Sequence, residues 1–428
     1  MDARTLPPVV ERFLRYVRID TRADRDSDAT PSSAKQKDLS RLLAEELAAL
    51  GVEDAAMDEH GVVYGRLPAL GAGEAAPTLA LVAHVDTSPD EPGGPVVPVI
   101  HWDYDGGAVE LPGDPAVRLD PERSPALADH VGHHLVTGDG TTLLGSDDKA
   151  GVAIIMQAVE NLLADGARPR PPLAVCFTVD EEIGRGVDHL DYDRLGAEVA
   201  YTVDGGAVGT FSFETFHAAE ARIRVRGTNV HPGYAKDIMV NALTIVAEIL
   251  QGLPESERPE STSGREGYFC PYESSATISE ANVRILLRDF EEKGMARRRA
   301  LVTSLVEAAR LRHPKATIEL ELVDQYKNMR SYIEEKDSRA VSFAFAAAEE
   351  LGIELESELV RGGTDGSRMS EAGLPTPNVF TGGHDFHSRF EWNTVQNLEA
   401  ALAYVEALVT YWGEHGGSTR SPKASAGS

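Results

Sequence analysis

Three short runs of the chain are apolar almost throughout. They lie at residues 78–84, 172–179 and 199–203, and turn-forming or acidic residues border them. Runs of this length predict strands that are buried on both faces of an α/β sheet. We therefore expect them to be neighbouring strands at the centre of one domain.

Helical patterns separate these runs. In residues 148–166, apolar side chains recur three and four positions apart, and Asp148 stands where an N-cap is expected. Near the N-terminus, Val10, Phe13 and Val17 form a similar stripe, which predicts a packed first helix rather than the apolar core of a signal peptide. Strands alternating with helices indicate an α/β fold.

The pattern changes in the middle of the chain. Residues 220–227 alternate between apolar and charged side chains, as a half-buried strand does. The expected elements that follow are a helix at 237–252, strands near 274–279 and 281–290, a helix at 291–312 and a strand at 317–323. This order, βαββαβ, is that of a ferredoxin-like sandwich.

Patterns of the α/β type resume after this block, so we expect it to be inserted. The later elements are a helix at 335–351, a strand near 377–381 and a helix at 395–413. The predicted domains are a catalytic domain of residues 1–215 and 333–428 and an inserted domain of residues 216–332. The small, polar residues from about 416 onward predict a disordered tail.

Composition narrows the functional classes. A length of 428 residues exceeds one typical core and favours two domains. The net charge of −28, from 41 basic and 69 acidic residues, argues against binding to nucleic acid or to anionic lipid. Cys176 and Cys270 are too few for a disulfide framework. No apolar run reaches membrane-spanning length, and we expect a cytoplasmic protein.

Acidic and imidazole side chains occur at five places, mostly where a predicted strand ends. These residues are His84 and Asp86; Asp147 and Asp148; Asp180, Glu181 and Glu182; Asp204; and His384 and His387. Taken singly, most have a plain structural explanation, such as a helix cap or a loop histidine with a hydrogen-bond partner. The three consecutive acids are different, because such a run at a buried sheet edge is costly without a counter-ion.

Together the five clusters contain what a two-metal hydrolase needs. Two ions share a water, lower its pKa and polarise the scissile carbonyl, while an unligated carboxylate removes the proton. Side chains alternate along an extended segment, so one of Glu181 and Glu182 can hold a metal while the other faces the water. Nitrogen and oxygen ligands without thiolate suit zinc, with cobalt or manganese as alternatives. The spacing does not choose between His384 and His387.

Seven motifs then support a resemblance to a known family. They are HVDTSPD (84–90), LLGSDDKAG (143–151), FTVDEEIGRG (177–186), YTVDGG (201–206), NVHPGYAKDIMVNA (229–242), RGGTDG (361–366) and TGGHDFH (381–387). From about residue 5 to residue 413 the chain resembles the M20 metallopeptidases, and among them the tripeptide aminopeptidases. The resemblance implies a three-layer α/β/α zinc-exopeptidase domain with a ferredoxin-like lid and dimerisation domain.

The resemblance also implies a role for each residue of the centre. The ligands of one zinc ion would be His84, Asp147 and Asp204, and those of the other Asp147, Glu182 and His387. Asp147 would bridge the ions, and in the family a cis peptide follows it. Asp86 would orient His84, and Glu181 would be the general base. His387 is preferred because these aminopeptidases usually have tyrosine in place of His384.

Four further residues are implied to bind substrate. His231 would stabilise the oxyanion, and in dimeric relatives this histidine comes from the partner subunit. Asn241 would help to bind the peptide. Arg288 and Arg361 resemble positions that recognise the terminal carboxylate, as a bidentate clamp would, although either could form a structural ion pair instead. A homodimer through the inserted domain is the expected assembly.

The predicted function is release of the N-terminal residue from tripeptides. Asp204 favours an aminopeptidase, because related carboxypeptidases tend to have glutamate there. The long segment between Asp86 and Asp147 also resembles that of the family's tripeptide aminopeptidases. The alternative with the same chemistry is a dipeptidase or an N-acyl amino acid amidohydrolase. An inactive scaffold or metal-buffering protein is disfavoured, because Glu181 and all five ligands are present.

Overall fold

The computed structural model describes residues 5–418 and divides the chain into two units. The first unit takes in the chain up to Phe213, the segment Ser331–Glu358 and the chain from Thr364 onward. The second unit comprises Glu214–Arg330 and the short segment Leu359–Gly363. Most of the tail that the sequence predicts to be disordered, from residue 419 on, lies outside the described residues.

An eight-stranded sheet forms the centre of the first unit. In spatial order its strands are β1 (Glu53–Met57), β2 (Val63–Leu67), β8 (Leu173–Thr178), β3 (Leu79–His84), β9 (Val199–Gly205), β16 (Asn378–Phe380), β10 (Thr210–Thr215) and β15 (Glu356–Val360). Strands β8, β3, β9 and β16 are parallel to one another. Every residue of β3 and β8 is buried, which confirms that the continuous apolar runs are central strands.

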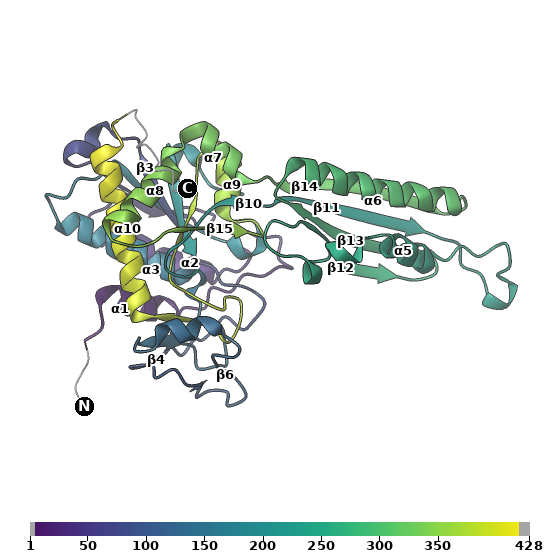
Figure 1. Ribbon diagram of the computed structural model, residues 1–428, viewed down its shortest axis with the longest axis horizontal. Coiled ribbons are helices and arrows are strands. Elements are labelled where there is room, and N and C mark those ends of the chain that lie inside the picture. The colour runs from purple at the N-terminus through teal and green to yellow at the C-terminus, as the bar shows by residue number, and fades with distance from the viewer. Residues whose placement is uncertain (1–4, 419–428) are drawn as a thin grey trace. The chain divides into compact units, whose positions relative to one another are not determined.

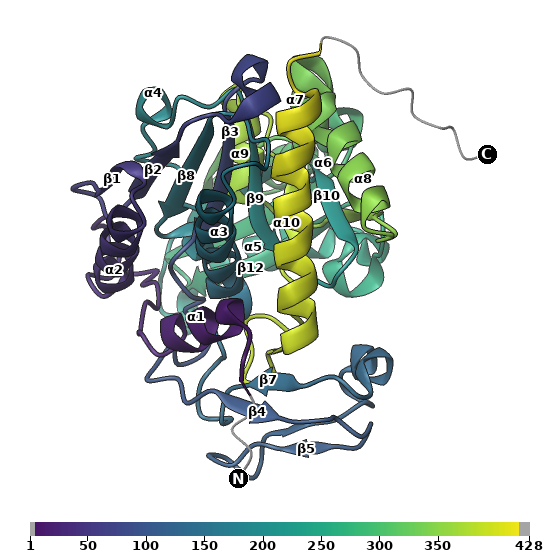
Figure 2. The same cartoon turned by 90° about the vertical axis from the view of Figure 1, so that its left-hand side faces the viewer.

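Helices cover this sheet on both faces. They are α1 (Pro8–Tyr16), α2 (Gln36–Ala49), α3 (Ser146–Ala164), α4 (Tyr192–Leu195), α7 (Met329–Asp337), α8 (Arg339–Glu350), α9 (Asp365–Glu371) and α10 (Val395–His415). Helix α3 packs on β3 and β9, with α1 and α10 beside it. Figure 2 shows α3 and α10 in front of the strands and α9 behind them. The predicted α/β architecture is therefore confirmed.

Helix α3 begins irregularly, which affects the candidate site directly. Gly145 precedes it with φ +81°, and Asp147 and Asp148 have non-helical backbone angles. The peptide bond between these two aspartates is cis. The Asp148 carboxylate accepts the N–H of Gly151 at 3.1 Å, as an N-cap side chain does, so the regular helix starts only after it.

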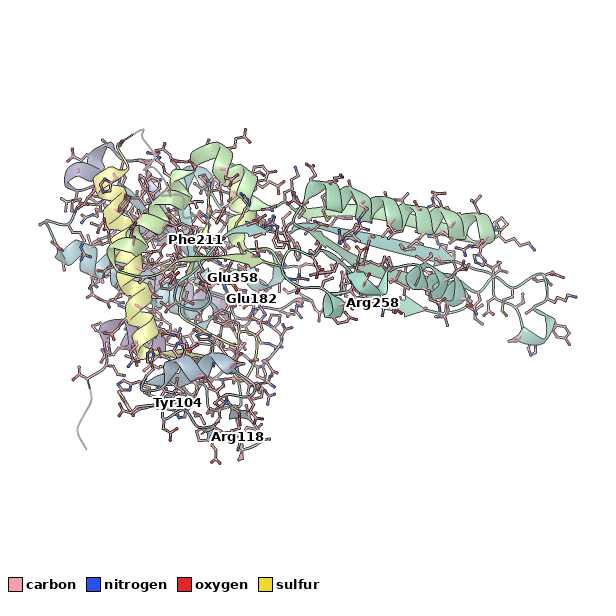
Figure 3. The ribbon with its side chains drawn as sticks, in the orientation of Figure 1. Tyr104, Arg118, Glu182, Phe211, Arg258 and Glu358 are labelled. Carbon is pink, nitrogen blue, oxygen red and sulfur yellow. The ribbon has the colours of Figure 1, made fainter. Side chains whose placement is uncertain are left out.

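The long segment between Asp86 and Asp147 forms two small sheets, one of which also includes a strand of residues 392–394. Strands β4 (Val99–His101) and β17 (Trp392–Thr394) flank β7 (Leu135–Thr137), while β5 (Val109–Glu110) pairs with β6 (Arg118–Leu119). The core of this accessory region is formed by Tyr104, Leu119, Leu127, Leu135 and Trp392. Figure 3 labels Tyr104 and Arg118 in this accessory region. These strands are only two or three residues long, which is too short for the apolar pattern of the sequence to predict them.

The second unit is a four-stranded antiparallel sheet with two helices. Its elements are β11 (His217–Arg226), α5 (Ala242–Gln251), β12 (Tyr268–Ala276), β13 (Glu280–Asp289), α6 (Glu292–Arg312) and β14 (Thr317–Tyr326), and the strand order is β12-β13-β11-β14. The predicted ferredoxin-like order is confirmed. Ile223 and Val225 face the helices within the core, and Figure 1 shows α6 running along β11 and β14.

The remaining differences between the predicted and observed elements concern boundaries and short strands. The single helix predicted at 335–351 is two helices, α7 and α8, and β12 begins six residues before the predicted strand. Strands β1, β2 and β10 carry no long apolar run and were not predicted. Short 3-10 helices lie at Gly71–Ala75, Pro125–His130, Glu181–Ile183, Pro232–Tyr234, Glu255–Glu257 and Pro259–Ser261. Between residues 5 and 418, no helix combines the length and apolarity that crossing a bilayer requires.

Candidate metal centre

The candidate ligands come from neighbouring elements of the central sheet. Strand β3 ends at His84, strand β9 contains Asp204 near its end, and Glu182 lies in the turn that follows β8. Asp147 lies at the start of α3, and His387 lies in the loop after β16. The carboxyl ends of parallel strands meet at one edge of a sheet, so these side chains converge there. Figure 3 labels Glu182 in the first unit.

His84 anchors the first group of three ligands. Its Nε2 lies 2.9 Å from Asp147 Oδ1 and 3.4 Å from Asp204 Oδ1. Its Nδ1 faces Asp86 instead, at 3.1 Å from the backbone oxygen and 3.3 Å from Oδ1. Without a cation, and despite burial, the charge of Asp204 and hydrogen bonds to the carboxylates raise the pKa of His84 well above its ordinary value. Because Asp86 holds the proton on Nδ1, Nε2 could give its lone pair to a cation placed among the two carboxylates, as metal-binding histidines do.

His387 anchors the second group. Its Nε2 lies 3.1 Å from Asp147 Oδ2 and 2.8 Å from Glu182 Oε2. Asp147 therefore presents Oδ1 to one group and Oδ2 to the other. In each group the three ligand atoms lie within 4.8 Å of one another. A carboxylate shared in this way can bridge two cations.

The electrostatics of the centre show an excess of buried negative charge. Burial, with the nearby charge of Asp147, raises the pKa of Glu182 to about 8, and burial raises the pKa of Asp204 to about 6. Burial also raises the pKa of Glu181 well above its ordinary value. Hydrogen bonds to Asp147 and Glu182 raise the pKa of His387 to about 11. Without a cation, the cluster is balanced only by retained protons.

The donor set fits two divalent cations. Two imidazole nitrogens and three carboxylates without thiolate suit zinc and its neighbours in the first transition row. Glu182 Oε1 is buried and has no hydrogen-bond partner within residues 5–418, although a buried carboxylate oxygen normally has one. A cation at this position would supply the missing partner.

Asp86 organises the turn that carries both glutamates. Its Oδ1 accepts the N–H of Glu181 and its Oδ2 the N–H of Glu182, each at 3.1 Å, and its side chain is fully buried. Asp180, with φ +60°, begins the turn. The Asp180 carboxylate accepts the N–H of Ser32 at 2.7 Å, which anchors the turn from the other side. The backbone of Glu181 and Glu182 is therefore held independently of their side chains.

Comparison with known proteins identifies the family. The model of "Peptidase family M20/M25/M40" matches residues 139–411. The chain belongs to peptidase family M20. This confirms the resemblance inferred from the seven motifs.

Individual M20 relatives match this chain over nearly its whole length. The peptidase T of Caldanaerobacter subterraneus subsp. tengcongensis is 42% identical over 408 residues, which cover 95% of this chain and 99% of that protein. The peptidase T of Geobacillus thermodenitrificans is 42% identical over 401 residues, which cover 94% and 97%.

Two solved structures have the same fold as this M20 peptidase. Aminopeptidase PepT from Bacillus cereus matches with a TM-score of 0.72 at 22% identity, over 95% of this chain and 98% of that one. A tripeptidase from Staphylococcus aureus matches with a TM-score of 0.75 at 20% identity, over 96% and 100%. The likeness extends over both units of the chain.

Two buried carboxylates near the centre of this M20 peptidase were not singled out from the sequence. Glu391 accepts the N–H of Gly145 at 2.7 Å and that of Asp147 at 2.9 Å, and burial raises its pKa to about 7. Asp365 accepts the hydroxyl of Thr178 at 2.8 Å, and burial raises its pKa to about 7 as well. A signal existed for Glu391, because an acid between Phe390 and Trp392 is unusual on a solvated surface.

The structure distinguishes the two histidines that spacing left open. His384 stacks on Trp392, with ring centroids 4.1 Å apart and an interplanar angle of 14°. Burial lowers the pKa of His384 to about 4, so it is neutral at physiological pH. His384 belongs to neither group of ligands, whereas His387 lies in the second.

The four residues implied to bind substrate lie in the second unit. His231 caps a 3-10 turn by accepting the N–H of Gly233 at 3.1 Å and is exposed, while Asn241 caps α5 through the N–H of Leu243 at 3.1 Å. Arg288 is nearly buried on β13 and donates to two backbone oxygens, at 3.0 and 3.2 Å. Arg361 donates to Gly264 and Thr262, at 2.9 and 2.8 Å. Both guanidinium groups are thus held by the unit itself.

Proposed function

We propose that this M20 peptidase is a metal-dependent aminopeptidase that releases the N-terminal residue of tripeptides. The observation that carries the proposal is a pair of ligand groups sharing Asp147, next to a carboxylate that belongs to neither group. That carboxylate, on Glu181, interacts electrostatically with His84, Asp204 and Glu182. The full-length likeness to proteins called peptidase T supports the substrate class.

The proposal assigns the two cation sites by ligand group. His84, Asp147 and Asp204 would hold one ion, and Asp147, Glu182 and His387 the other. Zinc is the proposed metal, with cobalt or manganese able to replace it. When bound, such a pair of ions lowers the pKa of a shared water and polarises the scissile carbonyl.

Protein side chains supply the proton transfer and the orientation. Glu181 takes a proton from the attacking water and later delivers it to the leaving amine. Glu181 belongs to neither group of ligands, so its carboxylate is available to hold that proton between the two steps. Asp86 keeps the His84 proton on Nδ1 and fixes the backbone of Glu181. Both functions of Asp86 preserve geometry rather than take part in bond breaking.

Substrate recognition is proposed for the ends of the peptide. Acidic side chains at the centre would pair with the ammonium of the first residue. Arg288 or Arg361 would bind the carboxylate of the third, because a guanidinium has five donors and each of these uses only some of them here. His231 would stabilise the oxyanion, and Asn241 would contact the peptide. A homodimer through the second unit and a cytoplasmic location complete the proposal.

A substrate panel with identified products tests this function. The stripped enzyme, reconstituted with zinc, is given a tripeptide, its N-acetyl and C-amide forms, a dipeptide, a tetrapeptide and an N-acyl amino acid. We expect the free tripeptide to lose its first residue, the amide to react much more slowly, and the acetylated peptide to remain intact. Mass spectrometry of the first product reads out the direction of cleavage.

Two other outcomes would redirect the proposal. Faster hydrolysis of the dipeptide or the N-acyl amino acid would favour the dipeptidase or amidohydrolase alternative, and release of the C-terminal residue first would exclude an aminopeptidase. Chelation should abolish activity, and zinc, cobalt or manganese should restore it. Full activity after exhaustive removal of metal would contradict the two-cation centre.

A further inference from the structure

The side chains of Glu391, which directly precedes β17, and of Trp392 and Asn393 within β17 alternate between two environments. Trp392 points into the accessory core, packs with Tyr104 and Leu135, and donates its ring N–H to Ser124 at 3.0 Å. Glu391 and Asn393, one position to either side, point the other way, as alternation along an extended chain requires. The buried tryptophan therefore fixes the direction of both polar neighbours.

Those two polar side chains hold three successive residues at the start of α3. Glu391 uses one oxygen for the N–H of Gly145, at 2.7 Å, and the other for the N–H of Asp147, at 2.9 Å. Asn393 donates to the hydroxyl of Ser146 at 3.0 Å. Glu391 is only 2% exposed, so water does not compete for these N–H groups. The segment that carries the shared ligand is thus held by a side chain some 245 positions away in the chain.

The loop that carries His387 closes on the same segment. At its base, His384 and Trp392 exchange two backbone hydrogen bonds, at 2.9 and 3.1 Å. Inside the loop, the Ser388 hydroxyl donates to the Asp385 carbonyl at 2.6 Å. Glu391 stands at this closed base, four residues after the ligand. Its two hydrogen bonds therefore connect the loop of one ligand to the segment of the other.

We infer that Glu391 is a positioning residue that sets the separation of His387 from Asp147, and so tunes the second cation site. The inference rests on the proposed two-cation centre. Glu391 reaches no ligand atom in the described structure, and its contacts are with backbone N–H groups. Its effect on the centre is exerted through the placement of Asp147 and His387, while His84 and Asp204 are held by β3 and β9.

A carboxylate is required because both of its oxygens accept. Glutamine has nearly the same size but only one acceptor oxygen, so Glu391→Gln directs an NH₂ group at one of the two N–H groups. Partners of this kind, one step removed from the ligands, typically change metal affinity by about 10–100-fold when replaced. We expect a loss of this size at the second site and a smaller one at the first.

Zinc titration of the full chain measures the two sites separately. Metal-free wild type and Glu391→Gln are titrated in competition with a chelating dye, and cobalt absorption spectra report the ligand geometry. We expect two ions in the wild type. In the variant we expect one ion of near-normal affinity and a second bound about 10–100-fold more weakly, with an altered cobalt spectrum. Thermal unfolding of the metal-free proteins checks that the fold is retained.

Two further variants make the result specific. Ser146→Ala removes only the Asn393 hydrogen bond to the same segment, so it should also weaken zinc binding at the second site, but by a smaller factor. This variant still tests the inference if Glu391→Gln fails to fold. Glu220→Gln is the matched control. It alters a buried carboxylate of the second unit that accepts from Arg222 and Arg284, and should leave zinc binding unchanged.

Three results would overturn the inference. If Glu391→Gln bound both ions as tightly as the wild type does, the positioning role of Glu391 would be wrong, and the proposed two-cation centre would be unaffected. If both sites weakened equally, in step with a large loss of thermal stability, Glu391 would have a general structural role only. If the wild type bound fewer than two ions, the proposed centre and this inference would fail together.

Discussion

Glu181 and Glu182 are adjacent carboxylates with different proposed roles, so replacing each in turn separates proton transfer from metal binding. The backbone N–H of each is held by Asp86 at 3.1 Å, and neither bond involves the glutamate side chains. Glu181→Ala should therefore leave the turn in place, with both groups of ligands intact. Glu182→Ala instead removes one of three ligands from the second group.

The expected size of each effect follows from these positions. Loss of a positioned general base typically lowers the rate about 10²–10⁴-fold, which corresponds to about 2.7–5.4 kcal/mol in the barrier. Glu181→Ala should show this loss in kcat with two ions still bound. Glu182→Ala also removes the oxygen that lies 2.8 Å from His387 Nε2, so it should lower metal occupancy towards one ion per chain.

The assay pairs product formation with metal content. Tripeptide hydrolysis is followed by chromatography at saturating peptide, and bound metal is measured by elemental analysis after removal of free ions. Glu181→Gln, which keeps the size of the side chain but cannot accept a proton, serves as the matched variant. If Glu181→Ala lost metal while Glu182→Ala kept both ions, the two roles would be reversed. Near-normal turnover in both Glu181 variants would refute the general-base assignment.

Three further predictions concern packing and pH. Gly151→Ala would place a Cβ 1.8 Å from the Val203 carbonyl oxygen, so urea denaturation should show about 3 kcal/mol or more of lost stability. Ile285→Ala, in the core of the second unit, should cost about 2–5 kcal/mol in the same assay. Burial alone would raise the pKa of Glu220. Hydrogen bonds from its neighbours, of which that from Arg284 has the largest effect, instead lower this pKa from 4.5 to about 2. The contribution of the ionised Glu220 carboxylate to folding stability is therefore complete above about pH 4.5 and is lost as the pH falls towards 2. The difference in unfolding free energy between wild type and Glu220→Gln should narrow over that interval. A difference that stays constant with pH would contradict this prediction.

The sequence by itself determined the central strands and the chemistry at their ends. Continuous apolar runs mark β3 and β8 because both faces of these strands are covered, and alternation marks β11 because one face is not. Acids that directly follow a buried strand have no solvent to stabilise them, which is why the cluster after β8 indicated a cation. These signals are local, so they can be recognised in the amino-acid sequence without knowledge of the fold.

Tertiary structure alone decided which polar groups meet. His384 and His387 are three residues apart and chemically identical, yet one stacks on Trp392 and the other lies beside Asp147. Glu391 gains its two N–H partners from a segment about 245 positions earlier in the chain. Short strands such as β4 and β7 likewise form only because distant segments pair. Contacts of this kind depend on where the backbone returns in space, and no local period in the sequence encodes that.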